Sequence, residues 1–201
     1  MPGTFGKNLD ILAVSLLEEF GETLRRQIVR SADELRWGRF DRLLSPLAKA
    51  QMRHGIEQTE CDHLFVLLVD PSGDGVRPVY HLPAGTADGV VIDPEQGGAA
   101  VQGVLAMTCA SGQAVCDFDV AGNPFWSGEL DGLSGATTRD LIAVPLRFAT
   151  RLRGVVAFLR TEERQRGMAA NAHHFRTACL VVSTLEPLID LHLASTILKW
   201  E

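Results

Sequence analysis

Four cysteines are the residues of this chain best suited to act as nucleophiles, redox centres or metal ligands. They are Cys61, Cys109, Cys116 and Cys179, with no CxxC pair and no regular spacing. Scattered cysteines of this kind are typical of reduced, buried thiols in an intracellular protein. Cys109 and Cys116 flank an expected helix-to-strand turn, so a redox or thiol-sensing pair near a binding site is an alternative.

Six histidines raise the question of a metal site. Cys61 and His63 alternate along an expected strand and share a face, while His173 and His174 open the last expected helix. A metal site needs three or four converging ligands, and the sequence shows only isolated pairs. We therefore expect no metal and no other cofactor, and we expect His173 and His174 to be exposed.

Arginines are concentrated near the N-terminus, where nucleic-acid contacts would be one use for them. The six arginines between positions 25 and 42 are interleaved with Glu22, Asp33, Glu34 and Asp41, as on a solvated helical surface. The formal net charge is −6 at pH 7. No phosphate-binding glycine loop, nucleophile elbow or paired-carboxylate motif is present. The sequence thus predicts no nucleic-acid partner and no catalytic residue.

Neither end of the chain indicates a membrane segment. No apolar run approaches the roughly 18 to 20 residues of a membrane span, and the first 20 residues lack the features of a signal peptide. We therefore expect a cytoplasmic protein that makes no membrane contact.

The elements that would position these residues follow from apolar spacing. Steps of three and four residues predict helices, and dense or alternating apolar runs between turn residues predict strands. Pro46 is expected to break or bend the second helix. The predicted helices cover residues 8–30, 33–54, 97–111 and 168–201, and the predicted strands cover 63–69, 76–82 and 114–118.

Residues 140–160, DLIAVPLRFATRLRGVVAFLR, predict two further strands around a turn near Thr150. Their density of apolar residues is typical of strands buried on both faces. Pro145 cannot donate to a ladder, so it should lie at a sheet edge, a bulge or a strand end. The order of elements predicts an α+β fold, an antiparallel sheet flanked by helices.

This hairpin resembles the signature of GAF domains, in which an "hAVPL" strand is followed by "xGVhxhxx". The passage GVLAMTCASGQAVCDFD is similar to the helix and strand that precede it in that family. The resemblance covers residues 60–198 and implies a GAF-like fold, related to that of PAS domains. We place an N-terminal helical extension at residues 1–58 and the GAF-like domain, with its long C-terminal helix, at 59–201.

The resemblance implies a ligand site beneath the loop from Val120 to Thr138. Aromatic residues there would stack on a ligand, and hydroxyl and guanidinium groups would donate hydrogen bonds to it. In the alternative, Phe125 and Trp126 fill the domain's own core. The candidate ligand-binding residues are Phe118, Phe125, Trp126, Ser134, Thr137, Thr138 and Arg139.

Several activities known in GAF domains do not match these residues. The Asn-Lys-Phe-Asp-Glu signature of cyclic-nucleotide GAF domains has no equivalent here. Cys109 and Cys116 are not followed by histidine, as a bilin attachment site would require. Reduction of free methionine sulfoxide needs a cysteine in the loop before the "VPL" strand, where residues 132–135 read GLSG. A serine hydroxyl is a far weaker nucleophile than a thiolate.

The sequence therefore predicts a sensor or regulatory domain that binds a small molecule. Its signal would pass through the packing of the terminal helices in a homodimer, and from there to a separate effector protein or to other parts of a longer protein. The alternative is a ligand-free scaffold for dimerisation or protein interaction. A third hypothesis, an enzyme of unknown type, has no motif to support it.

Overall fold

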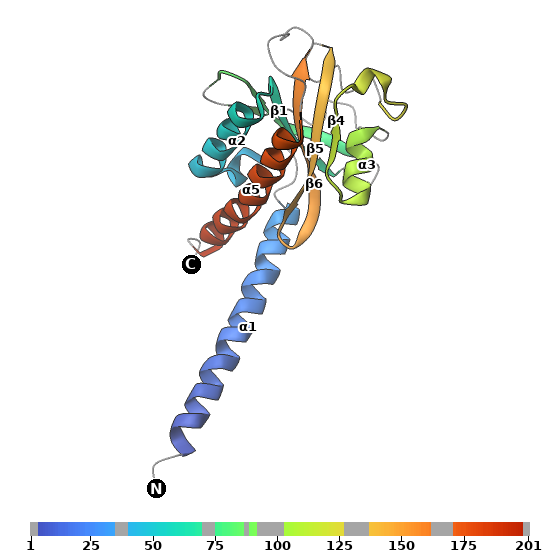
Figure 1. The fold of residues 1–201 in the computed structure, drawn as a ribbon. Coiled ribbons are helices and arrows are strands. Elements are labelled where there is room, and N and C mark those ends of the chain that lie inside the picture. The colour runs from blue at the N-terminus through green and yellow to red at the C-terminus, as the bar shows by residue number, and fades with distance from the viewer. Residues whose placement is uncertain are drawn as a thin grey trace.

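A six-stranded antiparallel sheet lies at the centre of the computed structural model (Figure 1). The structure describes residues 4–34, 40–69, 75–86, 89–91, 103–126, 137–161 and 171–198. The antiparallel α+β architecture predicted from the sequence is confirmed. In spatial order the strands are β3 (Val90–Val91), β2 (Val76–Pro83), β1 (His63–Val69), β6 (Arg151–Thr161), β5 (Thr138–Phe148) and β4 (Val115–Asp117).

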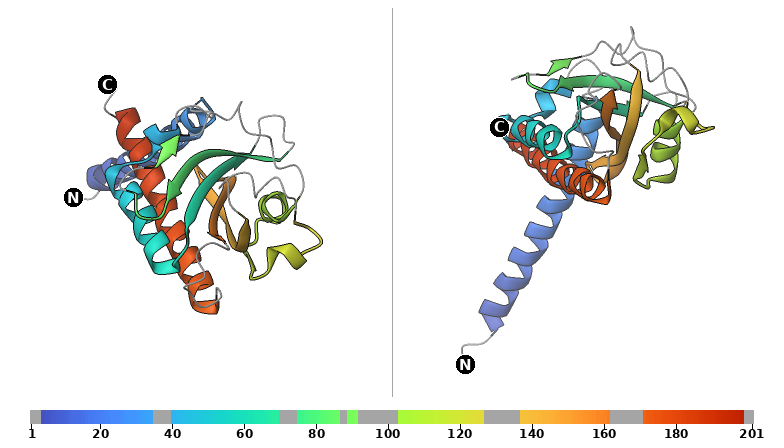
Figure 2. Two further views of the ribbon diagram at one scale, coloured as in Figure 1. Left: turned by 90° about the horizontal axis from the view of Figure 1, so that it is seen from above. Right: turned by 45° about the horizontal axis from the view of Figure 1, so that its top comes forward.

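Helices cover both faces of the sheet, so each face has its own apolar core (Figure 2). The larger core lies between the sheet and the helices α2 and α5. The smaller core lies between the sheet and α3 with the short helix η2. The helices are α1 (Thr4–Glu34), η1 (Phe40–Leu43), α2 (Pro46–Thr59), α3 (Val104–Ser111), η2 (Val120–Gly122) and α5 (Ala172–Leu198).

The second helix begins where the sequence predicted an interruption. Pro46 is the first residue of α2, and the Ser45 hydroxyl accepts a hydrogen bond from the Ala48 amide at 3.1 Å. Proline is favoured at this position because the first amides of a helix have no partner within the helix. The predicted break at Pro46 is confirmed, but the bounds of the predicted stretch 33–54 were wrong, because α1 ends at Glu34 and α2 runs from Pro46 to Thr59. Met52 and Ile56 place α2 in the larger core, whereas the domain boundary at residue 58 stays a prediction.

The β5–β6 hairpin matches its prediction closely. Leu141 to Leu146 are buried along β5, and Gly154 to Thr161 are buried along β6. Pro145 lies beyond the end of β4, which pairs with β5 only as far as Ala143, so it lies on an edge of the sheet as predicted. The turn residues Ala149 and Thr150 have φ angles of 50° and 64°. Both therefore adopt the left-handed conformation that glycine and asparagine prefer.

α5 is the one helix among the described residues that is long and apolar enough to span a membrane. Its buried side chains, however, pack against α2 and the sheet, as Val181, Leu185 and Ile189 illustrate. These contacts place one face of α5 in the larger core.

Replacing Thr150 by glycine should stabilise the protein by about 1 kcal/mol, because a β-branched residue is strained at positive φ. Thr150 is exposed, so the substitution removes no packing. Urea unfolding at pH 7.5 would measure the change. Thr150→Ala is the matched control, since it keeps a Cβ atom and should not give the same gain. Equal midpoints for all three proteins would show that the turn carries no strain.

Candidate functional site

The sheet face beneath α3 is the candidate ligand site, and its floor is apolar. The side chains that form it come from β1, β2, β5, β6, α3 and η2 and are fully buried. They are Phe65, Leu67, Val76, Val104, Leu105, Val120, Leu141, Ala143, Val155, Ala157 and Leu159, and we call them the α3-face core.

Two histidines stand beside this floor on neighbouring strands. His63 Nδ1 and His81 Nε2 are 3.0 Å apart, and the His81 ring stacks on Phe65 with centroids 4.1 Å apart. The centroids of the two imidazoles are 5.1 Å apart, so the facing nitrogens lie close to the line joining the rings. This is the geometry of a hydrogen bond in which one ring donates and the other accepts.

Burial keeps this histidine pair uncharged at neutral pH. It lowers the pKa of His81 to about 4, with a further contribution from His63, and it lowers the pKa of His63 as well. One outer nitrogen of the pair is then a donor and the other an acceptor. The sequence analysis missed the pair because it depends on the β1–β2 register, which places His81 opposite Phe65.

Asp117 and Asn123 organise the segment that follows β4. The Asp117 carboxylate accepts hydrogen bonds from the Asn123 side chain and the Asp119 amide, and Asn123 Oδ1 accepts from the Phe125 amide at 2.8 Å. Trp126 packs partly against the α3-face core, while Phe125 is 63% exposed. Phe125 is therefore mostly exposed to solvent, and of these two aromatic residues it is Trp126 that contacts the α3-face core.

The other predicted ligand residues are dispersed. Phe118 is 45% exposed and Thr137 is exposed, whereas Thr138 is buried opposite Thr161 in the β5–β6 ladder. Arg139 donates to Asp140 at 2.9 Å. Ser134 lies outside the described residues, so its role stays a prediction.

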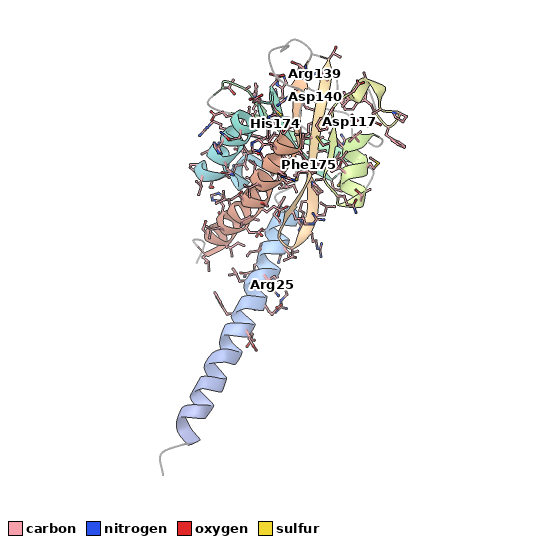
Figure 3. All side chains as sticks on the ribbon, in the orientation of Figure 1. Arg25, Asp117, Arg139, Asp140, His174 and Phe175 are labelled. Carbon is pink, nitrogen blue, oxygen red and sulfur yellow. The ribbon has the colours of Figure 1, made fainter. Side chains whose placement is uncertain are left out.

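On the opposite face, Arg160 links four elements at the open end of the hairpin. Its guanidinium donates to Thr59 O at 2.7 Å and to His174 Nδ1 at 3.2 Å, and it lies 3.9 Å from the Asp140 carboxylate. Glu60 Oε2 is 3.7 Å away. Figure 3 labels two of these partners, Asp140 on β5 and His174 at the start of α5. The cluster ties the end of α2 to β5, β6 and the start of α5.

His174 corrects a prediction, because it is 6% exposed rather than lying at the surface. Its Nδ1 also accepts from the Asn171 amide at 3.3 Å. Burial and the adjacent Arg160 lower its pKa, so the ring is neutral and acts as an acceptor. His173, in contrast, is exposed as predicted.

The cysteines do not form the pair considered as an alternative. Cys109 packs against the α3-face core, whereas Cys116 packs against the core on the other side of the sheet. Burial raises the pKa of Cys61 to about 11 and of Cys116 to about 12, which disfavours thiolates. No group of three or more potential metal ligands occurs within the described part of the chain.

Three histidines with lowered pKa values should make the fold sensitive to acid. The unfolded chain takes up protons as the pH falls through about 6.5, while the folded protein resists protonation, so stability falls from there toward pH 4. Urea midpoints between pH 7.5 and 4.5 would measure this. His81→Gln should flatten the dependence, and His54→Gln, at an exposed position of α2, is the control. Identical pH profiles for wild type and His81→Gln would contradict the prediction.

Comparisons with known proteins identify the fold. No protein-family model and no curated protein matches the sequence. A domain described as part of a two-component sensor histidine kinase from Sinorhizobium meliloti is similar, with a TM-score of 0.54, 15% identity, and coverage of 77% of this chain and 96% of that one. The PixJ GAF domain of Thermosynechococcus elongatus, in its blue-light-absorbing form, has a TM-score of 0.52 and 16% identity over 76% of this chain and 90% of its own.

The GAF-B domain of DevS from Mycobacterium smegmatis has a TM-score of 0.51 and 10% identity, over 78% of this chain and all of its own. Similarity at such low identity is a similarity of fold. The resemblance drawn from the hairpin is thereby confirmed, and the chain has the fold of a GAF domain.

Proposed function

We propose that this chain is a cytoplasmic sensory or regulatory domain that binds a small molecule on its α3 face and signals through its terminal helices in a homodimer. Two of the similar solved structures support a sensory role by their names, a domain of a sensor histidine kinase and a blue-light-absorbing GAF domain. Neither defines a ligand for this chain. The proposal rests mainly on the arrangement of its own two cores.

The observation that carries the proposal is that the β5–β6 hairpin belongs to both cores. Leu141 and Ala143 enter the α3-face core, whereas Ile142 and Val144 enter the core that α5 shares. All four are nearly or fully buried. Close-packed interiors transmit displacement, so a ligand that shifts the hairpin from the α3 side also shifts the surface on which α5 rests.

Exposed leucines on α5 support association with a second copy. Leu180, Leu191 and Leu198 are 67%, 67% and 51% exposed. Their spacings of 11 and 7 residues place them within about 20° of one another around a helix. Leu185 is buried within the domain and Leu188 is partly buried against the larger core, so neither belongs to this exposed stripe. The exposed stripe offers the apolar surface that self-association would bury.

A ligand-free scaffold is the second candidate function. All eleven side chains of the α3-face core are fully buried and pack in one cluster, as in an ordinary structural core. A scaffold of this kind would use the same exposed stripe on α5 but would have no small-molecule partner.

Native mass spectrometry of the purified chain would separate the two functions. Additional mass that is lost on denaturation would give the size of a bound molecule and favour the sensor. A dimer without additional mass would favour the scaffold. A monomer without additional mass would contradict both.

Leu191→Glu should convert the dimer to a monomer, because it places a charge in the proposed interface. Thr196→Glu is the control, since Thr196 is exposed on the same helix but lies about 140° around it from Leu191. Light scattering after size-exclusion chromatography would give both masses. A Leu191→Glu protein that remains dimeric would exclude this surface as the interface.

A further inference from the structure

The tip of the β5–β6 hairpin is held by two carboxylates of α5. Glu186 Oε1 accepts a hydrogen bond from the Arg147 amide, and Asp190 Oδ1 accepts one from the Ala149 amide, both at 2.7 Å. The two acidic residues are four positions apart and therefore lie on one face of the helix. Hydrogen bonds to a charged acceptor are about twice as strong as neutral ones, so the tip is firmly attached to α5.

A charged contact also attaches the tip to α1. Arg153 Nη1 donates to Asp33 Oδ1, one residue before the end of α1. The Arg153 side chain is 15% exposed and lies over the Phe148 ring, 5.8 Å from its centroid. Arg151 Nη1 reaches the other Asp33 oxygen at 4.0 Å, but its side chain is 63% exposed. Asp33 therefore balances the charge of a largely buried arginine.

Within the part of α1 whose side chains are described, packing against the domain is confined to the last two turns, where α1 also contacts α5. Ala32 is buried, and Ile28 and Val29 pack partly against the larger core. Most side chains between positions 18 and 27 are exposed, and the helix extends away from the domain (Figure 1). Its direction is thus set by its last two turns.

We infer that the hairpin tip is a latch for α1, with the Asp33–Arg153 ion pair as its release point. The inference deepens the proposed function and rests on it, because it names the contact through which the hairpin controls the N-terminal helix. Moving the tip away from Asp33 would leave Arg153 without its carboxylate, and a partly desolvated charge is costly to leave unpaired. A displacement of the hairpin tip therefore either carries α1 with it or breaks the Asp33–Arg153 ion pair and separates α1 from the tip.

The tip is attached to both α5 and α1, and α1 is the helix that separates more easily because fewer of its described side chains are buried. α5 is held to the domain by seven buried residues in addition to the two carboxylates. In α1, by contrast, Ala32 is the only residue whose side chain is buried among those whose burial the structure describes. Among the residues whose burial is described, the Asp33–Arg153 pair is therefore a larger share of the contacts of α1 than the two carboxylate hydrogen bonds are of the contacts of α5.

Hydrogen exchange measured by mass spectrometry on the full chain tests this inference. Asp33→Asn should speed amide exchange in residues 28–34 by about tenfold or more, because it removes a hydrogen bond between two charged groups. Exchange in β1, β5 and β6 should not change. The control is Glu22→Gln, which removes an exposed ion pair with Arg25 on the same helix and should leave residues 28–34 unaffected.

Repeating the measurement in an Arg153→Met variant shows whether the effect of Asp33→Asn depends on the ion pair. Arg153→Met removes the largely buried charge at this contact and leaves Asp33 with the exposed Arg151, so adding Asp33→Asn should have a much smaller further effect on exchange in α1. Unchanged exchange in Asp33→Asn, an equal effect in the Arg153→Met background, or general loosening of the sheet would each overturn the latch.

The same measurements in a Leu191→Glu background keep the latch separate from dimerisation. Faster α1 exchange in Asp33→Asn there would support the latch even if native mass spectrometry found neither ligand nor dimer. A latch that fails while a ligand and a dimer are found would leave the proposed function in place.

Discussion

The structure depends on one constraint, that the β5–β6 hairpin is buried on both faces. Leu141 to Leu146 and Gly154 to Thr161 have no solvent side, so each of these residues must match the packing above or below the sheet. Gly154 shows how tight the fit is, because a Cβ atom there would lie 1.9 Å from the Leu67 carbonyl oxygen of β1. The two cores are consequently not independent, since both are built on the same eleven-residue strands.

The hairpin is also fixed at both ends by an arginine that has lost most of its solvent. Arg160 joins the open end to α2 and to the start of α5, and Arg153 joins the turn to α1. Buried charges add little net stability, but they are costly to separate from their partners. The two arginines therefore fix the position of the hairpin relative to the helices and contribute little to the free energy of unfolding. The hairpin can move only together with the helices or by breaking a charged contact.

Local patterns allowed much of the fold to be predicted, and contacts distant in sequence explain what was missed. The strand 63–69 and the turn at Thr150 follow from apolar runs and short-range turn chemistry. Pro46 was expected to break or bend a helix, and Ser45 immediately before it is the capping signal that would have predicted the start of a new helix there. The burial of His174 and the His63–His81 pair depend on partners 14 and 18 residues away, which one sequence does not reveal.

The filled α3-face core has a consequence for sensing. A ligand that enters there must displace side chains that already contact one another, so part of its binding free energy is spent on repacking them. The neutral histidine pair offers it one donor and one acceptor, but no full charge. Repacking on this side has to be accommodated by Leu141 and Ala143, whose neighbours along β5 support α5. A rearrangement within the α3-face core is therefore transmitted along β5 to the surface on which α5 packs.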